Sequence, residues 1–174
     1  IARRADAAHL REMAGRFRRG VAATVSAETG LARDRDLRTG EWLSTPTIGG
    51  FAPLLCGGDP ALVAEQRELF LGPQWCGHPD LQHAVPPTTS PSAPQFRPRR
   101  YWRGPQWPVV TWLFGRAAVE RGDVDLAAAL REESLRQLAD GSFAEYYHPF
   151  TGAALGSREQ SWTAAVALDW SVAR

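Results

Sequence analysis

Helical periodicity most constrains the fold of this chain, because no segment sustains the apolar–polar alternation of a half-buried strand. Asp59 precedes Pro60 as an N-cap before a first-position proline, and Gly122 ends one helix where Asp123 caps the next. Segments with helical spacing or helix boundary signals span 2–26, 50–55, 60–70, 108–121, 123–139 and 158–172. The sequence predicts an all-α fold with no sheet of more than two short strands.

Long irregular segments connect these helices. The longest, 72–104, holds most of the prolines, and a loop of that length in a compact domain is more often functional than idle. Short and long connections alternate, so we expect the long loops to gather at one end of the helices. Within 108–121 we expect a buried stripe of four residues, and we place Trp112 in the core. The stripe consists of Val109, Trp112, Leu113 and Ala117.

Composition excludes several classes of function. The 174 residues suffice for one domain, and the formal net charge of +1 favours neither nucleic-acid nor membrane binding. No apolar run reaches the ~20 residues of a membrane span, and no signal peptide is visible. Cys56 and Cys76 form no CxxC pair, so we expect reduced thiols and a cytoplasmic location.

One carboxylate lies among aromatic residues in a turn-rich segment. Glu145 belongs to the segment 143–152, FAEYYHPFTG. Two other motifs are YWRGPQWP at 101–108 and SWTAA at 161–165. Aromatic faces stack on sugar rings, arginine and tryptophan N–H groups bind hydroxyls, and a carboxylate can activate water. This combination is typical of a carbohydrate site.

The three motifs, in this order, resemble the C-terminal part of the processing α-glucosidase and mannosylglycerate hydrolase family, glycoside hydrolase family 63. Trehalases are similar at a greater distance. The resemblance covers most of the chain and is densest from Pro86 to Trp170. It implies an (α/α)6 barrel and hydrolysis of an α-linked sugar with inversion, without a cofactor.

The resemblance also implies two catalytic acids, an Asp as general acid and a Glu as general base. The Glu falls on Glu145, whereas no segment matches the motif of the acid. We therefore expect residues 1–174 to form about half of a barrel, the C-terminal portion of a single catalytic domain. The chain starts at Ile1 directly in helix-like sequence, as a piece cut from a longer protein would. Its expected partners are a carbohydrate and the missing N-terminal half.

The motifs supply the candidate substrate-binding residues, which we expect to converge with Glu145 on one concave surface. These residues are Tyr101, Trp102, Arg103, Gly104, Trp107, Tyr146 and Trp162. An aromatic cluster at a helix start is also typical of a core, so Trp107 and Trp162 could serve packing alone. Of Tyr146 and Tyr147, we expect one to face the site and the other the barrel wall.

Two positions depart from the family pattern. His148 stands where relatives commonly carry Asp or Asn, and Gln106 stands where an aliphatic residue is usual. Neither departure removes the base, but both change the hydrogen bonding available near the motifs.

Three other groups of residues have alternative interpretations. Cys76, His78, Asp80 and His83 match no established zinc spacing, so we expect no metal site. Asp34, Asp36 and Glu41 could supply the missing acid, but we favour a solvated turn as their interpretation. Arg97, Arg99 and Arg100 form either a solvated loop edge or a site for an anionic sugar acid.

Two functional hypotheses follow from the sequence. The first is the catalytic segment of an inverting hydrolase acting on an α-linked glucoside, mannoside or mannosylglycerate-type substrate. The second is a carbohydrate-binding or structural helical fragment of a truncated hydrolase, with no turnover of its own. The unmatched acid favours the second for the isolated chain, whereas Glu145 in its motif favours the first for the parent protein.

Overall fold

The computed structural model describes residues 7–172, and within them the chain is mainly helical. The first half contains α1 (Ala7–Ala22), the 3-10 helix η1 (Ile48–Phe51), α2 (Ala52–Cys56) and α3 (Pro60–Leu71). The second half contains α4 (Pro108–Arg121), α5 (Val124–Gln137), β1 (Tyr146–Tyr147), β2 (Ala154–Leu155) and α6 (Ser161–Val172). The strands form one antiparallel hairpin, which agrees with the predicted limit of two short strands.

Local capping signals set several helix boundaries as predicted. The Asp59 carboxylate accepts a hydrogen bond from the Ala61 N–H at the start of α3. Gly122 adopts φ = 75° at the end of α4, and Asp123 then accepts from the Leu126 N–H at the start of α5. The predicted short helix at 50–55 corresponds to η1 and α2.

Tertiary pairing shortens the first helix. We expected a helix over 2–26, but α1 ends at Ala22, and residues 2–6 lie outside the described part of the chain. The Ser26 N–H bonds the Leu31 carbonyl, and Val25 bridges Ala32. These contacts use backbone groups that a longer helix would need.

Tertiary pairing also delays the last helix, which begins at Ser161 instead of the predicted 158. The N–H groups of Glu159 and Gln160 bond the carbonyls of Ser142 and Phe143. Glu159 has φ = 56°, outside the helical range. Residues 157–160 therefore pair with the segment before β1. The helix before this segment, α5, also differs from the prediction: it ends at Gln137, two residues before the predicted 139.

The helices bury two apolar clusters. The first joins α2, α3, α4 and α5, where the Phe51 ring meets Phe70 and Trp75 edge-on. The second joins the end of α5, the hairpin and α6, around Tyr147, Val166 and Trp170. No helix within residues 7–172 is both long and apolar enough to span a membrane.

The predicted stripe along α4 is wrong at Leu113, which is 44% exposed. The buried residues of α4 are instead Pro108, Val110, Thr111, Phe114, Gly115, Ala117 and Ala118. This helix contacts α2, α5 and α6, so its apolar face is wider than a single stripe. Trp112 is half-buried against the second cluster, and its Nε1–H donates to Asp169 Oδ2 at 2.7 Å.

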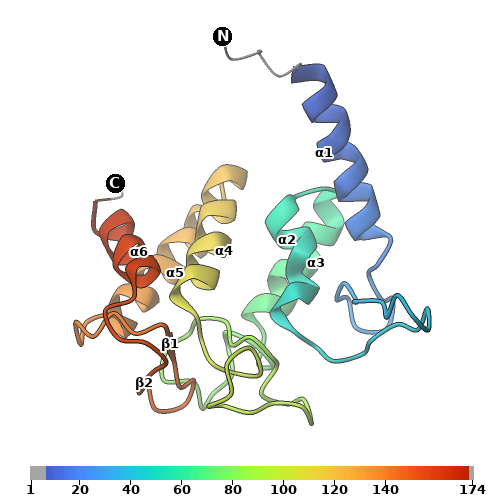
Figure 1. Ribbon diagram of the computed structural model, residues 1–174. Coiled ribbons are helices and arrows are strands. Elements are labelled where there is room, and N and C mark those ends of the chain that lie inside the picture. The colour runs from blue at the N-terminus through green and yellow to red at the C-terminus, as the bar shows by residue number, and fades with distance from the viewer. Residues whose placement is uncertain (1–6, 173–174) are drawn as a thin grey trace.

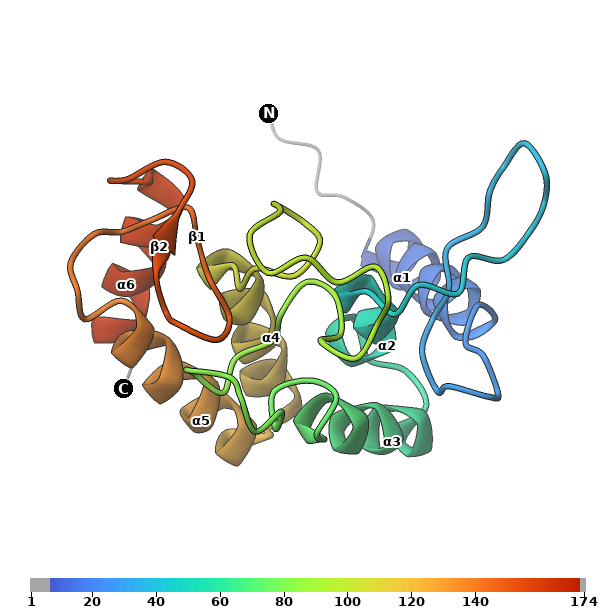
Figure 2. The same cartoon turned by 90° about the horizontal axis from the view of Figure 1, so that it is seen from below.

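The long connections lie at one end of the helices, as expected. Figure 1 shows the segments before α2, α4 and α6 together at the lower end of the molecule. The two segments that carry Tyr101 and Glu145 therefore lie at the same end of the fold. Seen from that end, the 72–104 loop crosses the middle of the molecule between the hairpin and α1 (Figure 2).

Candidate active site

The segments that carry Tyr101 and Glu145 are joined through their backbones. The Gln106 N–H donates to the Tyr147 carbonyl at 2.9 Å, and the Tyr147 N–H donates to the Gln106 carbonyl at 2.8 Å. This pairing places the residue after Gln106 beside the residue before Tyr147. The side chains of Trp107 and Tyr146, 39 positions apart in sequence, therefore meet.

The Glu145 carboxylate is held at both oxygens. Tyr101 Oη donates to Oε1 at 3.2 Å, and the Ser157 N–H donates to Oε2 at 3.2 Å. The backbone N–H of Glu145 donates to the Ser157 carbonyl at 2.8 Å. Desolvation and the hydrogen bond to Glu145 raise the pKa of Tyr101 above its usual value, so the phenol remains a donor at neutral pH.

Three aromatic rings form a stack beside this carboxylate. The Trp102 and Trp107 rings lie 4.1 Å apart between centroids and 6° from parallel, and the Tyr146 ring stacks on Trp107 at 5.0 Å. Tyr101 meets all three rings edge-on. Trp107 is buried, whereas Trp102 remains 44% exposed. The stack thus has a buried centre and an accessible outer ring.

The two tyrosines after Glu145 differ in burial and in the side chains that they contact. Tyr146 belongs to the stack, whereas Tyr147 is fully buried in the second cluster. The Tyr147 hydroxyl accepts from the Ala144 N–H at 3.1 Å and lies 3.3 Å from Ser142 Oγ. Tyr147 therefore fixes the turn that precedes Glu145.

The other candidate residues, Arg103, Gly104 and Trp162, differ in their exposure and in the groups that they contact. The Arg103 side chain is exposed, while its backbone bonds Arg97 and Arg100 across a tight turn. Gly104 is buried, and a Cβ there would lie 2.8 Å from the Arg97 carbonyl oxygen. Trp162 at the start of α6 is 57% exposed, and within residues 7–172 no ring contact joins it to the stack. Its role as a sugar contact stays a prediction.

The two departures from the family pattern are both built into the loops. Gln106 is fully buried, and its Nε2 donates to the carbonyls of His83 and Val85 at 2.9 and 2.6 Å. Its Oε1 accepts from Gln137 Nε2 at 2.9 Å. His148 lies in the hairpin, where partial burial and the charge of Arg99 lower its pKa.

Three further groups were considered from the sequence: the candidate acids, the candidate metal ligands and the arginines of the 72–104 loop. Asp36 accepts from the N–H groups of Arg38 and Thr39 in a turn that projects on the side of the molecule away from the hairpin (Figure 2). No three His, Cys, Asp or Glu side chains gather at metal-binding distance within residues 7–172. Arg97 donates to the carbonyls of Pro94 and Phe96, at an exposed loop edge.

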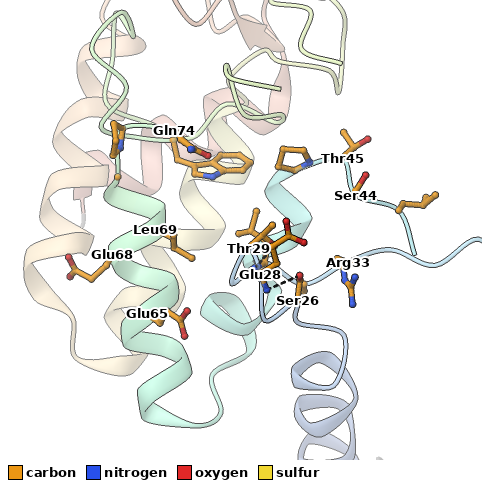
Figure 3. Close-up of a pocket in the computed structure, with 17 residues that line it drawn as sticks. Ser26, Glu28, Thr29, Arg33, Ser44, Thr45, Glu65, Glu68, Leu69 and Gln74 are labelled. Carbon is orange, nitrogen blue, oxygen red and sulfur yellow. Dashed lines mark hydrogen bonds between the residues drawn. The ribbon is translucent and has the colours of Figure 1, made fainter. Parts of the chain in front are cut away.

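A cavity of about 820 Å³ lies between the segment before α2 and the end of α3. Figure 3 shows its polar walls, which include Glu28, Arg33 and Glu65. Neither Glu145 nor the aromatic stack lines this cavity. Shape alone would select this cavity, but within residues 7–172 the only carboxylate held by two donors beside stacked aromatics is outside it. We therefore place the candidate site at Glu145.

Sequence reasoning missed two residues that shape the carboxylate. We predicted Ser157 as the opening residue of a helix, but its N–H binds Glu145. Gly156 adopts φ = 71°, and a Cβ there would lie 2.7 Å from Glu145 Oε2. The sequence signal for these two contacts is the Gly-Ser pair that lies 11 and 12 positions after Glu145. Its meaning depends on the pairing of β1 with β2, which the sequence did not predict.

Residues 1–163 match the family described as the mannosylglycerate hydrolase MGH1-like glycoside hydrolase domain. The chain belongs to this family. It is 54% identical over 171 residues to a glucosylglycerate hydrolase from Mycolicibacterium hassiacum, and 35% identical over 156 residues to a mannosylglycerate hydrolase from Thermus thermophilus. These matches cover 95% and 87% of this chain but only 37% and 36% of those enzymes.

Solved structures of the same family match the fold. A crystal structure of the family 63 mannosylglycerate hydrolase from Thermus thermophilus with glucose aligns with a TM-score of 0.84 at 32% identity. The complex of that enzyme with Tris and D-glycerate aligns with a TM-score of 0.83. Each alignment covers 95% of this chain and about two fifths of the other, 41% and 39%. The chain thus spans less than half the length of the relatives it matches.

Proposed function

We propose that this chain is the C-terminal portion of a single (α/α)6 catalytic domain in an inverting glycoside hydrolase, with glucosylglycerate as the first substrate to test. The observation that carries the proposal is the Glu145 carboxylate, bonded by Tyr101 and Ser157 beside the aromatic stack. The 54% identity to a glucosylglycerate hydrolase supports that choice of substrate over the mannosyl analogue.

In this proposal Glu145 is the general base. Its carboxylate takes a proton from water while the water oxygen attacks the anomeric carbon from the face opposite the leaving glycerate. Tyr101 and Ser157 hold the carboxylate in one orientation, so the remaining lone pairs face the water.

The leaving oxygen needs a proton from a second carboxyl group. Inverting enzymes keep the two carboxyl groups roughly 6.5–9.5 Å apart to leave room for the water. We assign the general acid to an Asp in the N-terminal half of the barrel, because the turn that contains Asp34 and Asp36 projects on the side of the molecule away from the hairpin (Figure 2).

The aromatic stack would bind the sugar. Trp102 presents an accessible ring whose position is fixed by Trp107 behind it. Apolar C–H faces of a hexose pack on such a ring, while exposed Arg103 can donate to hydroxyls or to the glycerate carboxylate. We propose that Gly104, Tyr146 and Trp162 complete the sugar subsite.

The test uses the full-length protein, encoded together with its upstream sequence. We expect it to release glucose from glucosylglycerate, and proton NMR of the first product should show the β-anomer. Release of the α-anomer would contradict inversion, and no release from glucosylglycerate, mannosylglycerate or α-linked disaccharides would contradict the hydrolase.

The isolated chain tests whether the general acid lies within these residues. We expect no turnover from it, because only one of the two required carboxyl groups is identified. Turnover by the isolated chain as a monomer would place the acid within these residues, and Asp34, Asp36 and Glu41 would be the first to examine.

A further inference from the structure

A short polar segment is buried in the middle of the 72–104 loop. Thr88, Thr89 and Ser90 are all nearly inaccessible, and Thr88 is 1% exposed. Burying a hydroxyl costs free energy unless it is hydrogen-bonded, so the partners of these side chains indicate what the segment stabilises.

The Thr88 hydroxyl binds both sides of one turn. Its Oγ1 accepts from the Gly104 N–H at 3.0 Å and donates to the Pro105 carbonyl at 3.1 Å. The Thr88 N–H also donates to the Pro105 carbonyl, at 3.1 Å. Gly104 is buried with φ = 156°, so few other donors or acceptors could replace this hydroxyl.

The same turn separates the two stacked tryptophans. Trp102 precedes Gly104-Pro105 and Trp107 follows it, so the conformation of the turn determines how the rings overlap at 4.1 Å. Tyr101, which donates to Glu145, is on the Trp102 side of the turn. A change in the turn would therefore move the accessible ring relative to the buried one.

The other side of the buried segment is anchored to the rest of the fold. The Thr88 carbonyl accepts from the Ile48 N–H at 3.0 Å, and Thr89 bridges Thr47. Ser90 Oγ donates to the Gln74 carbonyl at 3.1 Å. Thr88 thus links the turn to Ile48 at the start of η1, while Ser90 ties the same segment to Gln74, just after α3.

We infer that Thr88 is a positioning residue for sugar recognition, acting through the Gly104-Pro105 turn on the Trp102–Trp107 stack. The inference rests on the proposed hydrolase function and adds a specific residue to it. Thr88 does not touch the substrate; its hydroxyl holds the accessible tryptophan in the orientation that binds the sugar ring.

The experiment compares isosteric variants of the full-length protein on glucosylglycerate. Thr88→Val removes the hydroxyl and keeps the shape, so we expect KM to rise about 10-fold while kcat changes by less than about threefold. Thr88→Ser keeps the hydroxyl and should restore KM to within about threefold of wild type.

Thr111→Val is the matched control. Thr111 is also fully buried, and its hydroxyl donates at 3.4 Å to the carbonyl of Trp107, the N-cap residue of α4. That carbonyl also accepts from the N–H groups of Val110 and Thr111, which the valine variant keeps. We expect Thr111→Val to lower the melting temperature without changing KM. If Thr88→Val does not fold, Thr88→Cys replaces it. We then expect a rise in KM smaller than the rise expected for the valine variant, because the thiol is a weak donor.

Near-UV circular dichroism separates this inference from the proposed function. Trp102→Phe identifies the bands of the stack, and we expect Thr88→Val to alter those bands while Thr88→Ser and Thr111→Val retain them. This result stands even if the wild type hydrolyses nothing, which would contradict the proposed function alone. Unchanged bands in Thr88→Val, or equal defects in the Val and Ser variants, would overturn the inference.

Discussion

At the residue scale, the carboxylate of Glu145 is held by two donors that stay protonated at neutral pH. Tyr101 keeps its proton because its pKa is raised, and the Ser157 donor is a backbone N–H that does not titrate. A base held by such donors keeps its orientation across the neutral pH range.

His83 leads to a prediction about pH. Burial lowers its pKa below the usual value and outweighs the opposing charge of Glu133, whose Oε2 lies 3.8 Å from Nδ1. Folding therefore favours neutral His83, which contributes stability above the unfolded pKa that is lost as pH falls through the folded pKa.

We expect the full-length protein to lose unfolding free energy between about pH 7.5 and about pH 5.5, and His83→Gln to lose less. His148 also has a lowered pKa, so part of the dependence should remain in the variant. Urea titrations at the two pH values measure this difference. An identical loss in both proteins would contradict the role of His83.

The candidate base could be proposed from the sequence, but its hydrogen-bond partners could not. Glu145 was proposed from the segment 143–152 around it and from the order of the three motifs. Ser157 and Tyr101 reach it from 12 and 44 positions away, and only the tertiary pairing of loops brings them there. The same is true of Gln106, whose amide bonds carbonyls more than 20 positions upstream.

At the element scale, the β1–β2 hairpin places Gly156, the residue after β2, against Glu145. Gly156 has φ = 71°, and a Cβ would lie 2.6 Å from Tyr146 Cε1 and 2.7 Å from Glu145 Oε2. We expect Gly156→Ala to lower kcat by about 10- to 100-fold, because displacing a catalytic group by ~1 Å has that effect.

Gly122→Ala is the control for backbone strain. Gly122 has φ = 75° at the end of α4, but a Cβ there meets nothing within 4 Å. Both variants should lose stability of the order of 1–3 kcal/mol, and only Gly156→Ala should lose activity per folded molecule. Equal kcat values in the two variants would show that Gly156 does not constrain Glu145.

Helix boundaries were predictable where the signal is local. Asp59-Pro60 and Gly122-Asp123 act within one turn, and their caps formed as expected. The start of α6 was not predictable, because the backbone of 157–160 bonds 142–145 instead of continuing a helix. The exposure of Leu113 likewise depends on which neighbours cover α4.

At the scale of the whole molecule, large apolar side chains are exposed on the first and last helices. On α1 they are Leu10, Met13 and Phe17, and on α6 they are Trp162, Leu168 and Val172. α1 also contains no buried residue, and its N-terminal part projects from the other helices (Figure 1). Uncovered apolar surface of this kind favours association.

We expect the isolated 174-residue chain to self-associate, and co-expression with the upstream half to give a single species of full-length mass. Sedimentation velocity over a concentration series measures both. A monodisperse monomer of the isolated chain at all concentrations would contradict the proposal that an N-terminal half covers these helices.

The proposed (α/α)6 barrel follows from the sequence only through the resemblance of three motifs. The helices and the gathering of loops follow from periodicity and connection lengths, whereas closure of the proposed toroid would depend on residues outside this chain. The similarity of 95% of the chain to about 41% of a family 63 hydrolase is consistent with this division.

The central claim is that Glu145 is the general base, and the Glu145→Gln variant of the full-length protein tests it most directly. The amide keeps the shape of the side chain but cannot accept a proton from water. We predict that kcat on glucosylglycerate falls by about 10²–10⁴-fold, with the melting temperature and KM retained. Glu120→Gln, at an exposed position on α4, should leave kcat unchanged. A Glu145→Gln turnover within about threefold of wild type would contradict the account.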